Sequence, residues 1–143
     1  MAISPRILVK DMDVGYGEVV LQRGLNFAVN AGEVFVIMGR SGCGKSTLLK
    51  QMIGLKPPAT GDVLYDGKAL WATEPEDRLP TMRRIGVLYQ SGALWSSMTL
   101  LENVALLLGE HTDLSPRDVR ELASLKLGLV GLSGFEDYYP AEL

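Results

Sequence analysis

Residues 39–46 read Gly-Arg-Ser-Gly-Cys-Gly-Lys-Ser and match G-x-x-x-x-G-K-[ST], the pattern of the phosphate-binding loop in nucleotide triphosphatases. A triphosphate needs many hydrogen-bond donors that converge on one point without side chains in the way. Glycines at positions 39, 42 and 44 let the backbone curl so that successive N–H groups point inward, and a helix that follows adds its positive end. The pattern also predicts that Lys45 reaches the β- and γ-phosphates and that the Ser46 hydroxyl binds Mg²⁺.

The residues on either side of the loop indicate a strand before it and a helix after it. Residues 34–38, Val-Phe-Val-Ile-Met, form an uninterrupted apolar run that is typical of a strand buried on both faces. After the loop, a helix with one apolar face is expected to end at Gly54. The residues of that face are Leu48, Leu49, Met52 and Ile53. This strand–loop–helix context favours a phosphate-binding loop over a glycine-rich turn that fits the pattern by chance.

Elsewhere the sequence predicts strands early and helices late. Strands are expected over residues 7–14, 19–27 and 85–89, with Gly15-Tyr16-Gly17 as the turn between the first two. The segment 63–70 predicts a hairpin, because Asp66-Gly67 suits a type I′ turn. Thr99 and Glu102 fit a capping box, and Ser115 followed by a proline predicts a second helix start. Together these elements indicate a mixed α/β chain whose sheet is partly antiparallel.

Composition limits the classes of function that the chain can have. At 143 residues it is one domain or part of one. The net charge is −3 and the basic residues are scattered, so we expect no nucleic-acid partner. A single cysteine excludes an internal disulfide and suits a reducing cytoplasm. No apolar run approaches the ~18 residues of a membrane span and no signal-peptide pattern is visible, so direct membrane insertion is not expected.

The catalytic equipment of a hydrolase is not visible beside the loop. Such an enzyme needs a further acid on Mg²⁺, usually where an apolar strand ends, and a group that orients water. Asp11 follows a strand that a lysine interrupts, and Asp66 is better explained as a turn residue. His111 is the single histidine and is expected in a solvated loop between two helices. No catalytic residue is therefore assigned.

Three features in this order resemble the first half of an ATP-binding-cassette (ABC) transporter ATPase: Tyr16 between two early strands, the loop at 39–46, and Gln90 at a strand end. The resemblance covers essentially all of the chain. Residues 89–94, 101–106 and 110–112 are more specific. They resemble the branch that serves bacterial phospholipid transport systems maintaining outer-membrane lipid asymmetry, together with relatives associated with mammalian-cell-entry proteins.

This resemblance implies ATP and Mg²⁺ as cofactors. Tyr16 would stack on adenine, Thr47 would reach the α-phosphate, and Gln90 would contact the Mg²⁺ site together with Ser46 and report its occupancy. The implied nucleotide-binding residues are Tyr16, Gly39, Arg40, Ser41, Gly42, Cys43, Gly44, Lys45, Ser46 and Thr47. Without the resemblance, Tyr16 could be an exposed turn aromatic and Gln90 a polar strand end.

The resemblance also implies an architecture and partners. We expect a P-loop nucleotide triphosphatase core with an N-terminal antiparallel β subdomain and the start of a helical subdomain, in an incomplete domain. Residues 1–143 would be the N-terminal part of one ATP-binding domain, with the core over roughly 1–90 and the helical part over 91–143. The region Ser91–Asn103 would receive a membrane permease subunit, and the full-length protein would form a homodimer. Its place would be cytoplasmic, on the inner face of the cytoplasmic membrane.

The chain ends at Leu143, where the signature segment begins in this family. The Ser-Gly-Gly signature, the aspartate–glutamate strand end and the switch histidine are therefore not in the sequence. We expect weak MgATP binding, negligible hydrolysis and a tendency to aggregate. Three alternatives stay open: an ABC ATPase for another cargo, a P-loop GTPase or small-molecule kinase, and a non-catalytic nucleotide-binding module. No Asn-Lys-x-Asp motif for guanine is present, and the loop follows several earlier strands, both of which disfavour the second alternative.

Overall fold

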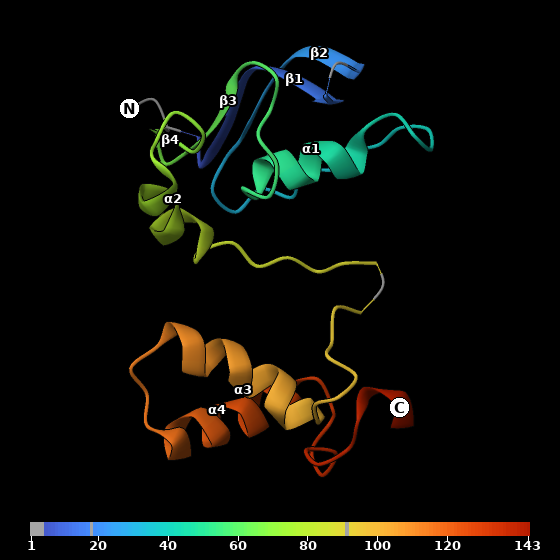
Figure 1. Ribbon diagram of the computed structural model, residues 1–143, viewed down its shortest axis with the longest axis vertical. Helices are drawn as coiled ribbons and strands as arrows, with labels where there is room; N and C mark the ends of the chain where they lie inside the picture. The colour runs from blue at the N-terminus through green and yellow to red at the C-terminus, as the bar shows by residue number, and fades with distance from the viewer. Residues whose placement is uncertain (1–4, 18, 91) are drawn as a thin grey trace. The chain divides into compact units, whose positions relative to one another are not determined.

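A four-stranded antiparallel sheet organises the residues before and after the predicted phosphate loop (Figure 1). The computed structural model describes residues 5–17, 19–90 and 92–143. Strand β1, Ile7–Tyr16, pairs with β2, Val19–Val29, on one side and with β3, Asp62–Tyr65, on the other. Strand β4, Lys68–Ala69, completes the order β2-β1-β3-β4. The predictions of strands over residues 7–14 and 19–27 are confirmed. The predicted turn is wrong for Gly15 and Tyr16, because they continue β1 and pair with Val20 and Val19.

The β3–β4 hairpin turns as its sequence predicts. Asp66 has a φ of 51° and Gly67 a φ of 79°, so both central residues lie in the left-handed region that a type I′ turn requires. Leu64 pairs with Ala69 and Tyr65 with Lys68. The prediction of a type I′ hairpin over 63–70 is therefore confirmed.

Helix α1, Lys45–Met52, begins directly at the end of the predicted loop. Leu48, Met52 and Ile53 are buried as predicted, whereas Leu49 is exposed. Gly54 has a φ of 82°, which is the left-handed conformation expected of a residue that ends a helix. The helix lies along one face of the sheet (Figure 1). It forms one core with β1, β3 and the residue after β4, made of Val9, Met12, Val14, Leu48, Met52, Val63 and Leu70.

Two predicted strands are wrong. Residues 34–38 and 85–89 run without strand pairing, and several of their apolar side chains are open to solvent: Val34 is 89%, Met38 85% and Leu88 97% exposed. The physical reason is that a strand exists only with a hydrogen-bonded neighbour, and among the described residues neither run is paired with a strand. Phe35 is held at one point, because its ring stacks on Phe27 of β2 with centroids 4.9 Å apart.

Helix α2, Pro75–Met82, was not predicted. Its start carries two local signals, a proline at the first helical position and acidic residues in the first turn, which suit a helix N-terminus. Pro80 lies inside the same short helix, and a proline there argues against a helix when only sequence is considered.

Two longer helices form the rest of the chain. Helix α3 spans Leu100–His111 and α4 spans Pro116–Leu129, and they lie side by side (Figure 1). Both predicted starts are confirmed: the Thr99 hydroxyl accepts from Glu102 N at 3.2 Å, and the Ser115 hydroxyl accepts from Asp118 N at 3.2 Å. Their shared core contains Leu100, Leu101, Ala123 and Leu127. A 3₁₀ turn over Pro140–Glu142 follows.

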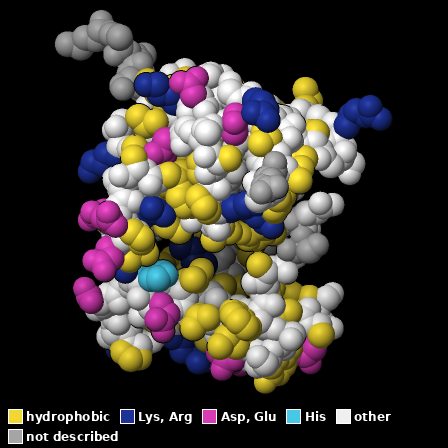
Figure 2. Space-filling view, turned by 45° about the horizontal axis from the view of Figure 1, so that its top comes forward, with side chains coloured by type: hydrophobic (Ala, Val, Ile, Leu, Met, Phe, Trp, Pro, Cys, Tyr) yellow, Lys and Arg dark blue, Asp and Glu magenta, His cyan; other side chains and the backbone are white. Residues whose placement is uncertain are grey.

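The chain divides into two compact units, one ending at Val87 and the other beginning at Leu88. Hydrophobic side chains reach the surface of the chain between charged ones on the face shown in Figure 2. His111 ends α3 instead of lying in a loop, although it is exposed as expected. The predicted division into one ATP-binding domain with its core over roughly 1–90 stays a prediction.

Candidate functional site

The phosphate loop closes around the ammonium group of Lys45. Its Nζ donates to the carbonyl oxygens of Gly39 at 2.6 Å and Arg40 at 2.8 Å, and lies 3.8 Å from the sulfur of Cys43. The amide of Cys43 donates back to Arg40 O at 3.3 Å. The half-buried lysine is thus bonded to two carbonyl oxygens of its own loop, at the start of α1.

Glycine is required at the last turn of the loop. Gly44 has a φ of 101°, a conformation that costs an ordinary residue roughly 1–2 kcal/mol. A Cβ at this position would also meet side-chain atoms of Leu21 and Val14 at 3.3 Å. The loop therefore packs directly on β1 and β2, and a side chain at position 44 would require Leu21 and Val14 to shift.

Gln22 is a loop contact that sequence reasoning missed. This half-buried residue of β2 donates from Nε2 to the carbonyl oxygen of Cys43 at 2.9 Å. The bond joins residues that are far apart in sequence, so nothing in the local pattern could reveal it. Together with the packing of Gly44 it fixes the loop on the antiparallel sheet.

Tyr16 lies beside the helix that follows the loop. Its pKa is lowered, chiefly by a hydrogen bond with the Thr47 side chain, and further by the positive charges of Lys50 and Lys56, against a smaller opposing effect of desolvation. Thr47 is buried, Tyr16 is 46% exposed, and the ammonium nitrogen of Lys56 lies 3.2 Å from the centroid of the Tyr16 ring. The structure therefore brings Tyr16 and the loop helix together.

The remaining predicted site residues are exposed. Arg40, Ser41 and Ser46 all face solvent, with Ser46 in the first turn of α1. Gln90 is exposed and belongs to the unit that begins at Leu88, so its contact with the loop stays a prediction.

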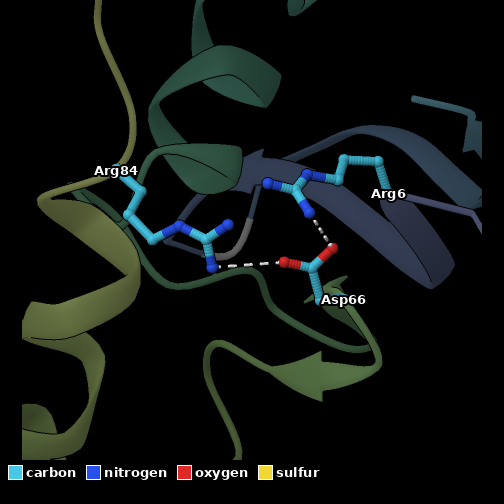
Figure 3. Close-up of polar contacts among 3 residues, drawn as sticks. All are labelled: Arg6, Asp66 and Arg84. Carbon is cyan, nitrogen blue, oxygen red and sulfur yellow. Dashed lines mark hydrogen bonds and ion pairs between the residues drawn. The ribbon is translucent and has the colours of Figure 1, made fainter. Parts of the chain in front are cut away.

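Asp66 performs the structural role of a turn residue. Its carboxylate binds Arg6 at 2.7 Å and Arg84 at 3.2 Å (Figure 3). All three side chains are substantially exposed, so each ion pair stabilises the fold by only about 0.2–1 kcal/mol. The pairs join the residue before β1, the β3–β4 turn and the residues after α2.

Asp11 also has a structural role, in a hydrogen bond between β1 and β2. It has a φ of 46° at an irregularity between Val9 and Met12 in β1, and its carboxylate accepts from Nδ2 of Asn26 at 2.8 Å. In the parts of the chain that the structure describes, no cluster of three or more His, Cys, Asp or Glu side chains could hold a metal ion.

Asn103 organises the segment before α3, within the predicted partner region Ser91–Asn103. Ser91 itself lies outside the described residues. The buried Asn103 side chain accepts from Trp95 N at 2.7 Å and donates to the carbonyl oxygens of Trp95, Met98 and Thr99 at 2.9–3.1 Å. Trp95 is nevertheless 63% exposed, so this segment presents a large apolar side chain on a fixed backbone.

A separate shallow groove of about 550 Å³ contains none of the predicted site residues. It is lined by Pro57, Pro58, Ala59, Thr60, Gly61, Asp62, Trp71, Ala72 and Arg78.

In the described residues, no helix is both long and apolar enough to cross a membrane.

The ABC transporter family model matches residues 22–140. The chain belongs to the ABC transporter family. The resemblance to ABC transporter ATPases that the sequence indicated is therefore confirmed for the family. The fold prediction is confirmed in the same way: the chain aligns with the dimeric ATP-binding cassette MJ0796 in complex with ADP and Pi, with a TM-score of 0.82 and 28% identity over 96% of this chain and 62% of that one.

Several curated proteins are similar over nearly the whole chain. The intermembrane phospholipid transport ATP-binding protein MlaF of Haemophilus influenzae is 37% identical over 96% of this chain and 52% of its own length. A probable ribonucleotide transport ATP-binding protein, mkl, of Mycobacterium leprae is 37% identical over 100% of this chain and 41% of its own length. The methionine import ATP-binding protein MetN of Brucella abortus is 36% identical over 98% of this chain and 38% of its own length. The chain thus spans about half the length of these relatives or less.

Proposed function

We propose that this chain is the nucleotide-binding part of an ABC transporter ATPase and binds MgATP through residues 39–47. The observation that carries the proposal is the position of the Lys45 ammonium, bonded to Gly39 O and Arg40 O inside a loop that begins a helix. A nucleotide would replace these two carbonyl contacts with phosphate oxygens. Charge-assisted bonds to phosphate are stronger than bonds to neutral carbonyls, so this exchange favours binding.

The other roles follow the family pattern residue by residue. The backbone N–H groups of Gly42, Gly44 and their neighbours would surround the phosphates, and the positive end of α1 would add to their field. Thr47 would contact the α-phosphate. Tyr16 would stack on adenine, a role supported by its exposure and by its closeness to α1.

The exposed hydroxyl of Ser46 in the first turn of α1 suits an Mg²⁺ ligand, and Gln90 would be a second contact to that ion. Magnesium would supply neutralisation of phosphate charge when bound. Hydrolysis is proposed only for a longer protein, because the carboxylates of Asp11 and Asp66 are used in the sheet and its turns.

Phospholipid is the cargo that we propose, on the basis of the similarity to MlaF. The similarities to mkl and MetN support the alternative that another cargo is moved. We further propose that a membrane permease binds at residues 91–103, where Asn103 fixes the backbone around the exposed Trp95. The full-length protein would work as a homodimer at the inner face of the cytoplasmic membrane. The runner-up function is a nucleotide-binding module without catalysis.

Equilibrium binding of ATP in the presence and absence of Mg²⁺ tests the proposal. Lys45→Ala removes charge-assisted bonds to phosphate and should weaken ATP binding roughly 10- to 100-fold. Lys68→Ala, an exposed lysine of β4, makes the same charge change and should leave the affinity unchanged. Equal ATP affinity in the wild type and Lys45→Ala would contradict the proposal.

Two further readouts separate the alternatives. Competition by GTP as effective as that by ATP would favour a GTPase over an adenine-binding ATPase. Multiple turnover of ATP by this chain, lost in Lys45→Ala, would contradict the expectation that hydrolysis needs a longer protein.

A further inference from the structure

Lys56 is fixed over the ring of Tyr16 by the way α1 ends. Gly54 adopts a φ of 82°, and the amides of Leu55 and Lys56 then both donate to Lys50 O, at 2.9 and 3.2 Å. This closed helix end holds the backbone of Lys56. Its ammonium nitrogen lies 3.2 Å from the Tyr16 ring centroid, well inside the ~6 Å range of a cation–π interaction.

Lys56 and the phosphate loop adjoin opposite ends of one helix. Helix α1 begins at Lys45 of the loop and ends at Met52, four residues before Lys56, and the Lys56 ammonium group covers one face of the Tyr16 ring. A base joined to phosphates on residues 39–47 would stack on the Tyr16 ring. Competition arises when the base stacks on the face that the ammonium group covers.

The ammonium group and a stacked base cannot share that face. Stacked aromatic rings lie in contact across their faces, which is the space that the Lys56 nitrogen fills. Binding of the base therefore requires the lysine to leave, and the free energy of the cation–π contact is lost from the binding free energy.

We propose that Lys56 sets the affinity of the site for the nucleotide base by competing with that base for the Tyr16 ring. The proposal rests on the proposed function, because it needs Tyr16 to be the residue on which the base stacks. It adds a residue that opposes base binding, next to residues 39–47 that favour phosphate binding.

Lys56→Met tests the competition, because it keeps a flexible apolar stem and removes the charge. Loss of an exposed cation–π contact should tighten ATP binding roughly two- to fivefold. Tripolyphosphate has no base, so its affinity should stay the same or fall as one positive charge is removed. Tighter binding of ATP without tighter binding of tripolyphosphate is the signature of competition at the ring.

Two controls isolate the ring. Lys50→Met removes another positive charge that acts on Tyr16. Because Lys56 is the cation that lies over the Tyr16 ring in the described residues, Lys50→Met should not tighten ATP binding. In a Tyr16→Leu background the gain from Lys56→Met should disappear. Far-UV circular dichroism of each variant checks that the fold is kept.

The outcomes separate this proposal from the proposed function. Tighter ATP binding in Lys56→Met, with no gain for tripolyphosphate and none without Tyr16, supports the proposal. Wild-type binding of ATP with unchanged or weaker affinity in Lys56→Met overturns the proposal alone. A wild-type chain that binds neither ATP nor tripolyphosphate overturns the proposed function and this proposal with it.

Discussion

The half-buried phenol of Tyr65 contributes to the stability of the unit that ends at Val87. Its hydroxyl donates to the carbonyl oxygen of Met52 at 2.8 Å, which ties β3 to the end of α1. Burial raises the pKa of Tyr65 to about 12, compared with about 10 in an unfolded chain. The folded chain therefore keeps this proton over a pH range in which the unfolded chain releases it.

This difference in proton affinity predicts a pH dependence of stability. Below pH ~10 both states are protonated, so the contribution of Tyr65 is constant; from pH ~10 to ~12 the unfolded state ionises first and the free energy of unfolding falls. Tyr65→Phe should lower the free energy of unfolding by about 1 kcal/mol at pH 8, because it removes the hydrogen bond. Above pH ~10 the free energy of unfolding of this variant should fall less steeply than that of the wild type. Urea unfolding at stepped pH measures both effects. Parallel curves for the two proteins would contradict the prediction.

At the scale of elements, the capping box of α3 is the clearest local determinant. Thr99 and Glu102 exchange side-chain and backbone bonds of 3.2 and 2.8 Å. Thr99→Ala should destabilise the unit formed by α3 and α4 by about 1 kcal/mol. Thr99→Ser keeps the hydroxyl and is the matched control. The test is chemical unfolding followed by far-UV circular dichroism, and equal midpoints for Ala and Ser would refute the role of the cap.

Elements defined by neighbouring residues could be predicted from the sequence. The two helix caps at Thr99 and Ser115 and the turn at Asp66 depend on contacts within a few residues. The strands over 34–38 and 85–89 could not be judged in this way. Their apolar runs match a buried strand, but pairing depends on a neighbour that the described residues do not provide.

The candidate site shows the same division. Residues 39–46 were recognised because the motif is continuous, and Gly44 has the left-handed φ that the motif implies. Gln22 contacts the loop, and Lys56 contacts Tyr16, only in the packed fold. Neither residue belongs to a local sequence motif, so the sequence alone could not assign them to the site.

Two unpaired segments expose apolar side chains to solvent in the described residues. Val34, Val36 and Met38 are strongly exposed in a run that lacks strand pairing, and Leu88 is almost fully exposed in a second such run. Extended apolar segments with unpaired N–H and C=O groups are templates for pairing between chains. The expected consequence for this chain is self-association.

Sedimentation velocity over a series of concentrations measures that association. The wild type should show species larger than a monomer whose fraction increases with concentration. Val36→Lys places a charge in the centre of the unpaired run and should shift the chain toward the monomer. Leu107→Lys, at an exposed position of α3, adds the same charge outside the run and should have little effect. A wild type that sediments as a monomer at every concentration would contradict the predicted self-association. If both lysine variants shift the chain toward the monomer equally, added charge explains the shift and the unpaired run is not the contact surface.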